Sequence, residues 1–159
     1  MRLTTFTDYS LRVLIFLAAE PERRATIREI AQAFDISENH LMKVAHVLGK
    51  AGLLANVRGK GGGLQLAKEP RAINIGRVVR TTEGRPMPAA CFTGEQDACV
   101  ITPVCRLRGV LREAVGTFYG VLDRYTLEDL VRNRRALGEL LLFEPAPGPR
   151  RALALKAAR

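Results

Sequence analysis

The sequence predicts a mainly α-helical protein: a winged helix-turn-helix fold with a small β-hairpin wing and a long C-terminal helix. Three observations predict this class. Two short amphipathic helix patterns follow one another in residues 26–52, a glycine-rich hairpin pattern occupies residues 53–67, and a long apolar stripe at helical spacing begins after Cys105. We expect three regions along the chain: a head, 1–84; a cysteine loop and long helix, 85–132; and a basic, disordered tail, 133–159.

The length and composition are those of one globular domain. The chain has 159 residues, of which 47% are hydrophobic, so it can bury a core. No apolar stretch approaches 18 residues without a charge, and the first ten residues lack the pattern of a signal peptide, so we expect no membrane association. An odd number of cysteines, three, without an export signal favours the reducing cytoplasm.

The positive charge is concentrated at the two ends of the chain. Residues 1–80 carry a net charge of +6, residues 81–132 carry −1 and residues 133–159 carry +4, within a total of +9. A basic head indicates a polyanionic partner such as nucleic acid. The alternative, which composition alone leaves open, is ordinary solvated surface charge.

The first predicted helix covers residues 7–19, with Thr7 as its N-cap. It is apolar on most faces, which is typical of a helix that lies between other elements.

Residues 26–52 predict a helix-turn-helix unit. Thr26 and Glu29 have the spacing of a capping box at the start of one helix, and Ser37 caps a second helix that Gly52 ends. In such units the second helix enters the DNA major groove, where Asn bonds adenine and Lys reaches guanine or phosphate. A plain helical hairpin is the alternative. The residues of this unit that we expect to contact DNA are Thr26, Ser37, Asn39, His40 and Lys43.

The hairpin pattern predicts the wing. Two short strands flank the segment RGKGGG, residues 58–63, which is both cationic and rich in glycine. This segment lacks the spacing of a nucleotide-binding loop and leads into a strand rather than a helix, which excludes that function. Glycine allows close approach to phosphate, and cations enter the minor groove, so we expect DNA contacts from Arg58, Lys60, Gly61 and Gly62.

Three further helices are predicted after the wing. A short helix covers residues 74–84 and a final turn covers residues 127–131. Between them, residues 105–124 form a long helix with a wider apolar stripe than a small head needs. We expect this helix to pair with its copy in a homodimer, since DNA readers of this kind are generally dimeric. Packing against its own head is the alternative.

All three cysteines lie within fifteen residues, as Cys91, Cys99 and Cys105, among loop-forming Gly94, Asp97 and Pro103. Clustered thiolates bind soft metals, either zinc or an iron–sulfur cluster. Three unrelated buried cysteines are the alternative. The chain has no C-x-x-C pair, no nucleophile–base arrangement and no cofactor loop, so we do not expect an enzyme.

Several segments resemble a known family. MRLTTFTDYSLRVLIFLA, ISENHLMKV, VRGKGGG, VVRTTEG and the run that begins CRLRGVLREA are similar to NsrR-type winged-helix iron–sulfur regulators, which are nitric oxide-sensing repressors related to IscR-type cluster-assembly regulators. The resemblance covers about residues 1–132. It implies a homodimeric repressor that binds a palindromic operator with an iron–sulfur cluster, 2Fe–2S or 4Fe–4S, and releases the operator when nitric oxide attacks the cluster.

The resemblance also implies the cluster ligands. The three cysteines match Cys91, Cys99 and Cys105, and an aspartate from the partner subunit matches Asp8. On sequence alone, Asp8 is equally well explained as an acidic residue that complements the helix dipole. IscR-type relatives place a histidine where this chain has Arg108, so an IscR-like regulator is the less favoured option. A zinc-binding or thiol-based redox-sensing DNA-binding protein is the other alternative.

Overall fold

The computed structural model describes residues 2–84, 89–92 and 99–141, so Gly94 and Asp97 of the predicted loop lie outside the described residues. The elements confirm a mainly helical fold with one small hairpin. In chain order they are α1 (Thr5–Ala19), α2 (Ile27–Phe34), α3 (Glu38–Lys50), β1 (Leu54–Val57), β2 (Gly63–Leu66), η1 (Pro70–Ala72), α4 (Ile75–Glu83), η2 (Ala90–Phe92), η3 (Thr102–Val104), α5 (Arg106–Leu122), α6 (Leu127–Leu130) and α7 (Arg134–Leu141).

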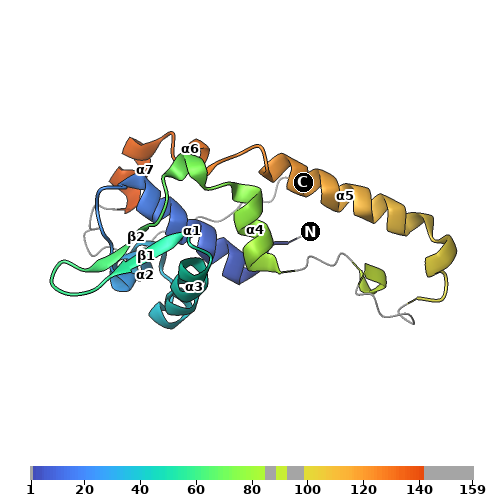
Figure 1. The fold of residues 1–159 in the computed structure, drawn as a ribbon, viewed down its shortest axis with the longest axis horizontal. Coiled ribbons are helices and arrows are strands. Elements are labelled where there is room, and N and C mark those ends of the chain that lie inside the picture. The colour runs from blue at the N-terminus through green and yellow to red at the C-terminus, as the bar shows by residue number, and fades with distance from the viewer. Residues whose placement is uncertain (1, 85–88, 93–98, 142–159) are drawn as a thin grey trace, which may run out of the picture.

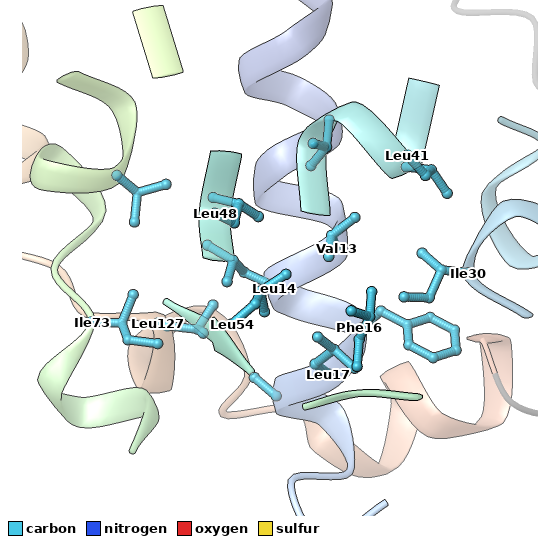
Figure 2. Close-up of a cluster of buried hydrophobic side chains, with 14 of the residues drawn as sticks. Val13, Leu14, Phe16, Leu17, Ile30, Leu41, Leu48, Leu54, Ile73 and Leu127 are labelled. Atoms are coloured by element: carbon cyan, nitrogen blue, oxygen red, sulfur yellow. The ribbon is translucent and has the colours of Figure 1, made fainter. Parts of the chain in front are cut away.

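Helix α1 runs through the centre of the head, as its apolar sequence predicts. Val13 and Leu14 are fully buried, and side chains from α2, α3, β1 and α6 surround the helix (Figure 2). The predicted N-cap is wrong, because α1 begins at Thr5 and its cap is Thr4, whose hydroxyl accepts the Thr7 N–H. Thr7 is instead fully buried and donates a hydrogen bond to Thr82 of α4 at 2.9 Å.

Helices α2 and α3 form the predicted helix-turn-helix. Thr26 and Glu29 make both bonds of the capping box at the start of α2. Asp35 then adopts a left-handed conformation with φ of 56°, which reverses the chain between the helices. Leu41, Val44 and Leu48 of α3 are fully buried against the core, so the opposite face of α3 is left for other contacts.

Strands β1 and β2 form an antiparallel hairpin in which Leu54 pairs with Leu66 and Val57 pairs with Gly63. A short bridge between Ala25 and Leu64 attaches the hairpin to the segment before α2. The N–H of each residue donates to the carbonyl of the other, at 3.1 and 2.8 Å. The wing is therefore joined to the helix-turn-helix by backbone bonds.

Helix α5 extends away from the head (Figure 1). Its C-terminal half crosses α4, where Gly76 allows close contact, since a Cβ there would lie 2.1 Å from Asp123 Oδ1. Arg80 of α4 bonds the same carboxylate through both terminal nitrogens, at 2.5 and 2.6 Å. The N-terminal half of α5 lies far from the head in the same view. No helix in the described part of the chain is both long and apolar enough to cross a membrane.

After α5 the chain returns to the head. Leu127 and Val131, in α6 and just after it, are fully buried in the same core as α1. The expectation of a disordered tail is wrong for residues 134–141, which form α7 and pack on α1. Leu137 and Leu141 explain this, because both lie half-buried against the core. Residues 142–159 lie outside the described residues.

Candidate nucleic-acid interface and cysteine site

The N-terminal part of α3 presents a polar, exposed surface. Ser37, Asn39, His40 and Lys43 are all exposed, in contrast to Leu41 and Val44 between and after them. Ser37 occupies the N-cap position without a side-chain capping bond, so its hydroxyl is not used within the helix. This surface has the donors and acceptors that base edges and phosphates require.

Thr26 and His40, both predicted to contact DNA, each make a contact within the fold. The Thr26 hydroxyl accepts the Glu29 N–H at 3.2 Å and so belongs to the capping box. Burial acts to raise the pKa of Glu29, but the Thr26 hydrogen bonds and the charge of Arg23 outweigh it and lower the pKa. The His40 ring lies 6.1 Å from the ring of Tyr9, centroid to centroid, which connects α3 to α1 next to Asp8.

The wing tip exposes its cations. Arg58, Lys60 and Gly61 are exposed, while Gly62 is half-buried. Gly61 has φ of 75°, and a Cβ on Gly62 would lie 2.3 Å from the Val57 carbonyl oxygen, so the turn requires glycine at both positions. The tip therefore holds two cations on a tight, backbone-rich turn.

A groove of about 780 Å³ separates α3 from the wing. Its walls include Met42, His46 and Lys50 from α3 and Asn56 from β1, and Thr26 and Gly62 also line it. Of the residues predicted to contact DNA, Thr26 and Gly62 line this groove, whereas those at the N-terminal part of α3 and the cations of the wing tip are not among its lining residues. His46 also lines this groove.

Sequence reasoning missed Arg24, which supports the wing. Its Nη1 donates to the Gly61 carbonyl at 3.3 Å, and its Nε donates to Gln65 Oε1 at 3.1 Å. The partners lie 37 and 41 residues away along the chain, so no local pattern signals these contacts.

The three cysteines are free thiols on short turns before α5. Cys91 lies in η2 and is half-buried, Cys99 is exposed, and Cys105 is the N-cap residue of α5. Thr102 in η3 connects the last two, because its N–H donates to the Cys99 carbonyl at 3.1 Å and its carbonyl accepts the Cys105 N–H. Within residues 2–84, 89–92 and 99–141, no three His, Cys, Asp or Glu side chains are close enough to hold a metal ion.

The chemistry of this segment fits an anionic, sulfur-ligated group. Three thiols are available, Cys105 lies at the positive N-terminal end of a 17-residue helix, and a cation is close by. That cation is Arg108, whose Nε is buried without a hydrogen-bond partner.

Asp8 lies in the first turn of α1, half-buried, and its carboxylate forms an ion pair with Arg12 at 2.8 Å. Arg12 in turn lies over the ring of Phe34, 5.8 Å from its centre, at the end of α2. The Arg12 side chain therefore links Asp8 to the helix-turn-helix. The Asp8 side chain itself is 45% exposed.

Comparison with known proteins identifies the family. The model of the Rrf2 family, described as iron-dependent transcriptional regulators, matches residues 3–133. The chain is 47% identical over 145 residues to HTH-type transcriptional regulator NsrR of Shouchella clausii (strain KSM-K16), covering 91% of this chain and 97% of that protein. It is 51% identical over 142 residues to the regulator of the same name from Bacillus subtilis (strain 168), covering 89% and 97%.

Solved structures of regulators are similar to this chain as well. CymR (YrzC), the global cysteine regulator of B. subtilis, matches with a TM-score of 0.65 and 33% identity, covering 84% of this chain and 98% of CymR. IscR of T. potens matches with a TM-score of 0.68 and 28% identity, covering 84% and 88%. These matches confirm the winged-helix fold and the resemblance to NsrR-type regulators, and they identify a DNA-binding regulator rather than an enzyme. The chain belongs to the Rrf2 family of iron-dependent transcriptional regulators.

Proposed function

We propose that this protein is a nitric oxide-sensitive transcriptional repressor that acts in the cytoplasm as a homodimer on palindromic operator DNA. The NsrR relatives, at 46–51% identity over about nine-tenths of the chain, support this assignment. The proposed division places DNA recognition in residues 1–84 and sensing with dimerisation in residues 85–132, while α6 completes the core of the head.

The proposed cofactor is an iron–sulfur cluster. Cys91, Cys99 and Cys105 would hold it through thiolates, and Asp8 of the partner subunit would be the fourth ligand. When bound, the cluster supplies iron that reacts with nitric oxide. The fit rests on three free thiols in one segment before α5, and on the acidic, half-exposed position of Asp8 at the start of α1.

The proposed dimer contact is a face of α5 that has no partner within the described residues of one chain. Val115, Phe118 and Leu122 pack towards the head, with Tyr119 buried beside them. Leu107 and Val110 lie on an adjacent side of the helix and are each 61% exposed. Exposed apolar side chains in a row along a projecting helix are typical of a subunit interface.

The proposed DNA contacts combine base reading with backbone binding. Asn39 and Lys43 of α3 would read base edges, with Ser37 and His40 beside them, while Arg58 and Lys60 of the wing would bind the flanking backbone and minor groove. A two-fold dimer places two α3 helices about 34 Å apart, which is one turn of DNA.

The proposed mechanism couples the cysteine segment to the head. With all four ligands in place, the cysteine segment of one subunit is attached to α1 of the other, and the two heads keep a spacing that fits the operator. A carboxylate is a weaker ligand for such iron than a thiolate, so of the four residues Asp8 would hold the cluster least firmly and would be the first to release it. Each head is then free to move, and the dimer population shifts away from the binding-competent arrangement.

One observation carries the proposal: α5 extends from the head (Figure 1), the cysteines lie before and at its N-terminal end, and the side chains proposed to contact DNA are exposed on the head itself. A ligand-controlled regulator needs such a sensing site and a separate binding site in one molecule.

The test uses protein purified without air. We expect a brown protein whose visible absorption bleaches on addition of nitric oxide. Duplexes selected from a random pool by the iron-loaded dimer should bind tightly, and binding should be lost after nitric oxide or after removal of iron. A colourless protein that contains stoichiometric zinc, or equal DNA affinity with and without iron, would contradict the proposal.

A further inference from the structure

Arg108 connects the two ends of the cysteine segment. It lies one turn into α5, three residues after Cys105, and its guanidinium carbon is 5.7 Å from the centre of the Phe92 ring. Phe92 directly follows Cys91 in η2. The cation–π contact therefore holds the turn that bears the first cysteine against the helix that begins at the third.

The guanidinium also carries a buried donor with no use in the protein. Arg108 Nε has no hydrogen-bond partner among the described residues, although its surface is removed from solvent. A buried N–H without an acceptor is destabilising and uncommon in native structures, so an unfilled position calls for an acceptor from elsewhere. An arginine cannot avoid the cost by losing its proton, because it stays charged at all ordinary pH values.

The surroundings indicate what that acceptor is. Three thiolates and a carboxylate around iron form a group with net negative charge and sulfur acceptors. Two of the proposed ligands are near Arg108 in the chain or beside its contact: Cys91 directly precedes the contacted Phe92, and Cys105 lies three residues before Arg108. An arginine donor beside sulfur ligands stabilises the added electron when such a group is reduced, since hydrogen bonds and charge near the sulfurs tune its potential.

We propose that Arg108 is a positioning residue for the cofactor: it donates its Nε–H to the sulfur-ligated group and sets that group's reduction potential and retention. This inference rests on the proposed function, because it assumes that the cysteines hold the cluster. It adds a residue outside the four proposed ligands.

The test compares three variants of the full-length, iron-loaded dimer prepared without air. R108Q removes the charge and the Nε donor, R108K keeps the charge but loses the planar donor, and R112Q removes an exposed arginine one turn further along α5. The measurements are the midpoint potential in an optical redox titration and the rate of iron transfer to a chelator.

We expect R108Q to shift the midpoint potential to a more negative value and to lose iron several-fold faster than the original protein. R108K should show a smaller shift in potential but faster iron loss, and R112Q should match the original protein in both. The inference is overturned if R108Q and R112Q give the same potential and the same rate of iron loss.

Two controls keep the result decisive. Far-UV circular dichroism of the iron-free forms shows whether R108Q folds. If R108Q does not fold, R108K is compared with R112K instead. Faster iron loss in R108K then supports the inference, and equal rates of iron loss contradict it. If the original protein takes up no iron, both the proposed function and this inference fail. If it binds iron and responds to nitric oxide but R108Q behaves like R112Q, only the inference fails.

Discussion

Asn39 is the side chain of α3 best suited to read a base. It is exposed in the first turn of the helix, two residues before the buried Leu41 that holds α3 against the core. N39A should reduce discrimination at one base pair of each half-site by about 1–3 kcal/mol, because the bidentate bond to adenine is lost. Competition binding with singly substituted duplexes measures this.

The other positions of the operator provide the internal control for N39A. Their preferences should stay unchanged. Uniform weakening across all duplexes would mean that Asn39 supports the helix or contacts phosphate instead.

Arg58 and Lys60 should act through charge alone. R58Q and K60Q should each weaken binding to every duplex and reduce the slope of log affinity against log salt by about 0.9, the value for one released phosphate contact. Binding isotherms between low and moderate salt measure the slope. R112Q, on the arm rather than the head, should leave the slope as it was. An unchanged slope in both wing variants would exclude the wing from the interface.

At the scale of single elements, the capping box of α2 is the clearest local determinant of the fold. The Thr26 side chain and the Glu29 carboxylate satisfy two backbone N–H groups, at 3.2 and 2.6 Å. T26A should lower the free energy of unfolding by about 1 kcal/mol, whereas T26S, which keeps the hydroxyl, should have little effect. Urea denaturation measures both, and equal stability of T26A and T26S would contradict the role of the cap.

The crossing of α4 and α5 should make stability depend on pH. Hydrogen bonds from Arg80 lower the pKa of Asp123, and the same pair raises the pKa of Arg80. A carboxyl whose pKa is lower in the folded state stabilises the fold above its unfolded pKa, about 3.9, and loses that contribution as the pH falls through the folded value. The stability difference between the original protein and D123N should therefore be constant near neutral pH and shrink below about pH 4.

Urea unfolding at a series of pH values between 7 and 3 measures this difference for D123N. Parallel curves for the two proteins over the whole range would show that the Arg80–Asp123 pair does not contribute. Arg80 also lies over the Tyr119 ring, with its guanidinium carbon 4.5 Å from the ring centre, so the Arg80–Asp123 pair is one part of a larger contact between the helices.

At the scale of the whole molecule, the free apolar side of α5 should decide the oligomeric state. L107E and V110E each place a carboxylate in the proposed interface, where dimerisation would remove its hydration at a high cost in free energy. The mass in solution should therefore fall from that of two 17.5 kDa chains to that of one. Sedimentation measures the mass, and operator affinity should fall with it because two half-sites are no longer bound together.

R112E is the matched control, since it places a carboxylate on the opposite side of α5. It should remain dimeric. Dimers in L107E and V110E would locate the interface elsewhere, whereas loss of the dimer in R112E as well would indicate a general effect on the helix.

The local elements of this fold were largely predictable. Capping at Thr26 and Asn74, the glycines that end α3 and α4, and the apolar spacing of α3 and α5 act between residues a few positions apart, so they can be read from the chain directly. The error at the start of α1 is instructive. Thr4 and Thr7 are equally good N-caps on sequence. In the structure the Thr7 hydroxyl instead bonds that of Thr82, which is 75 residues away in the chain.

The candidate site was predictable in type but not in its supporting contacts. The cysteines, the basic wing and the polar face of α3 were recognisable because each is a compact motif. Arg24 beneath the wing tip, Tyr9 against His40 and Arg108 over Phe92 were not. Each joins segments that only folding brings together.

By itself, then, the sequence determined the kinds of element, their order and the family, because capping, periodicity and motif spacing are properties of neighbouring residues. Tertiary structure alone decided that α7 packs on α1, that Arg80 and Asp123 join α4 to α5, and that Leu107 and Val110 of α5 stay exposed. The physical reason is that a side chain has many possible distant partners, and only the packing of the complete core selects among them.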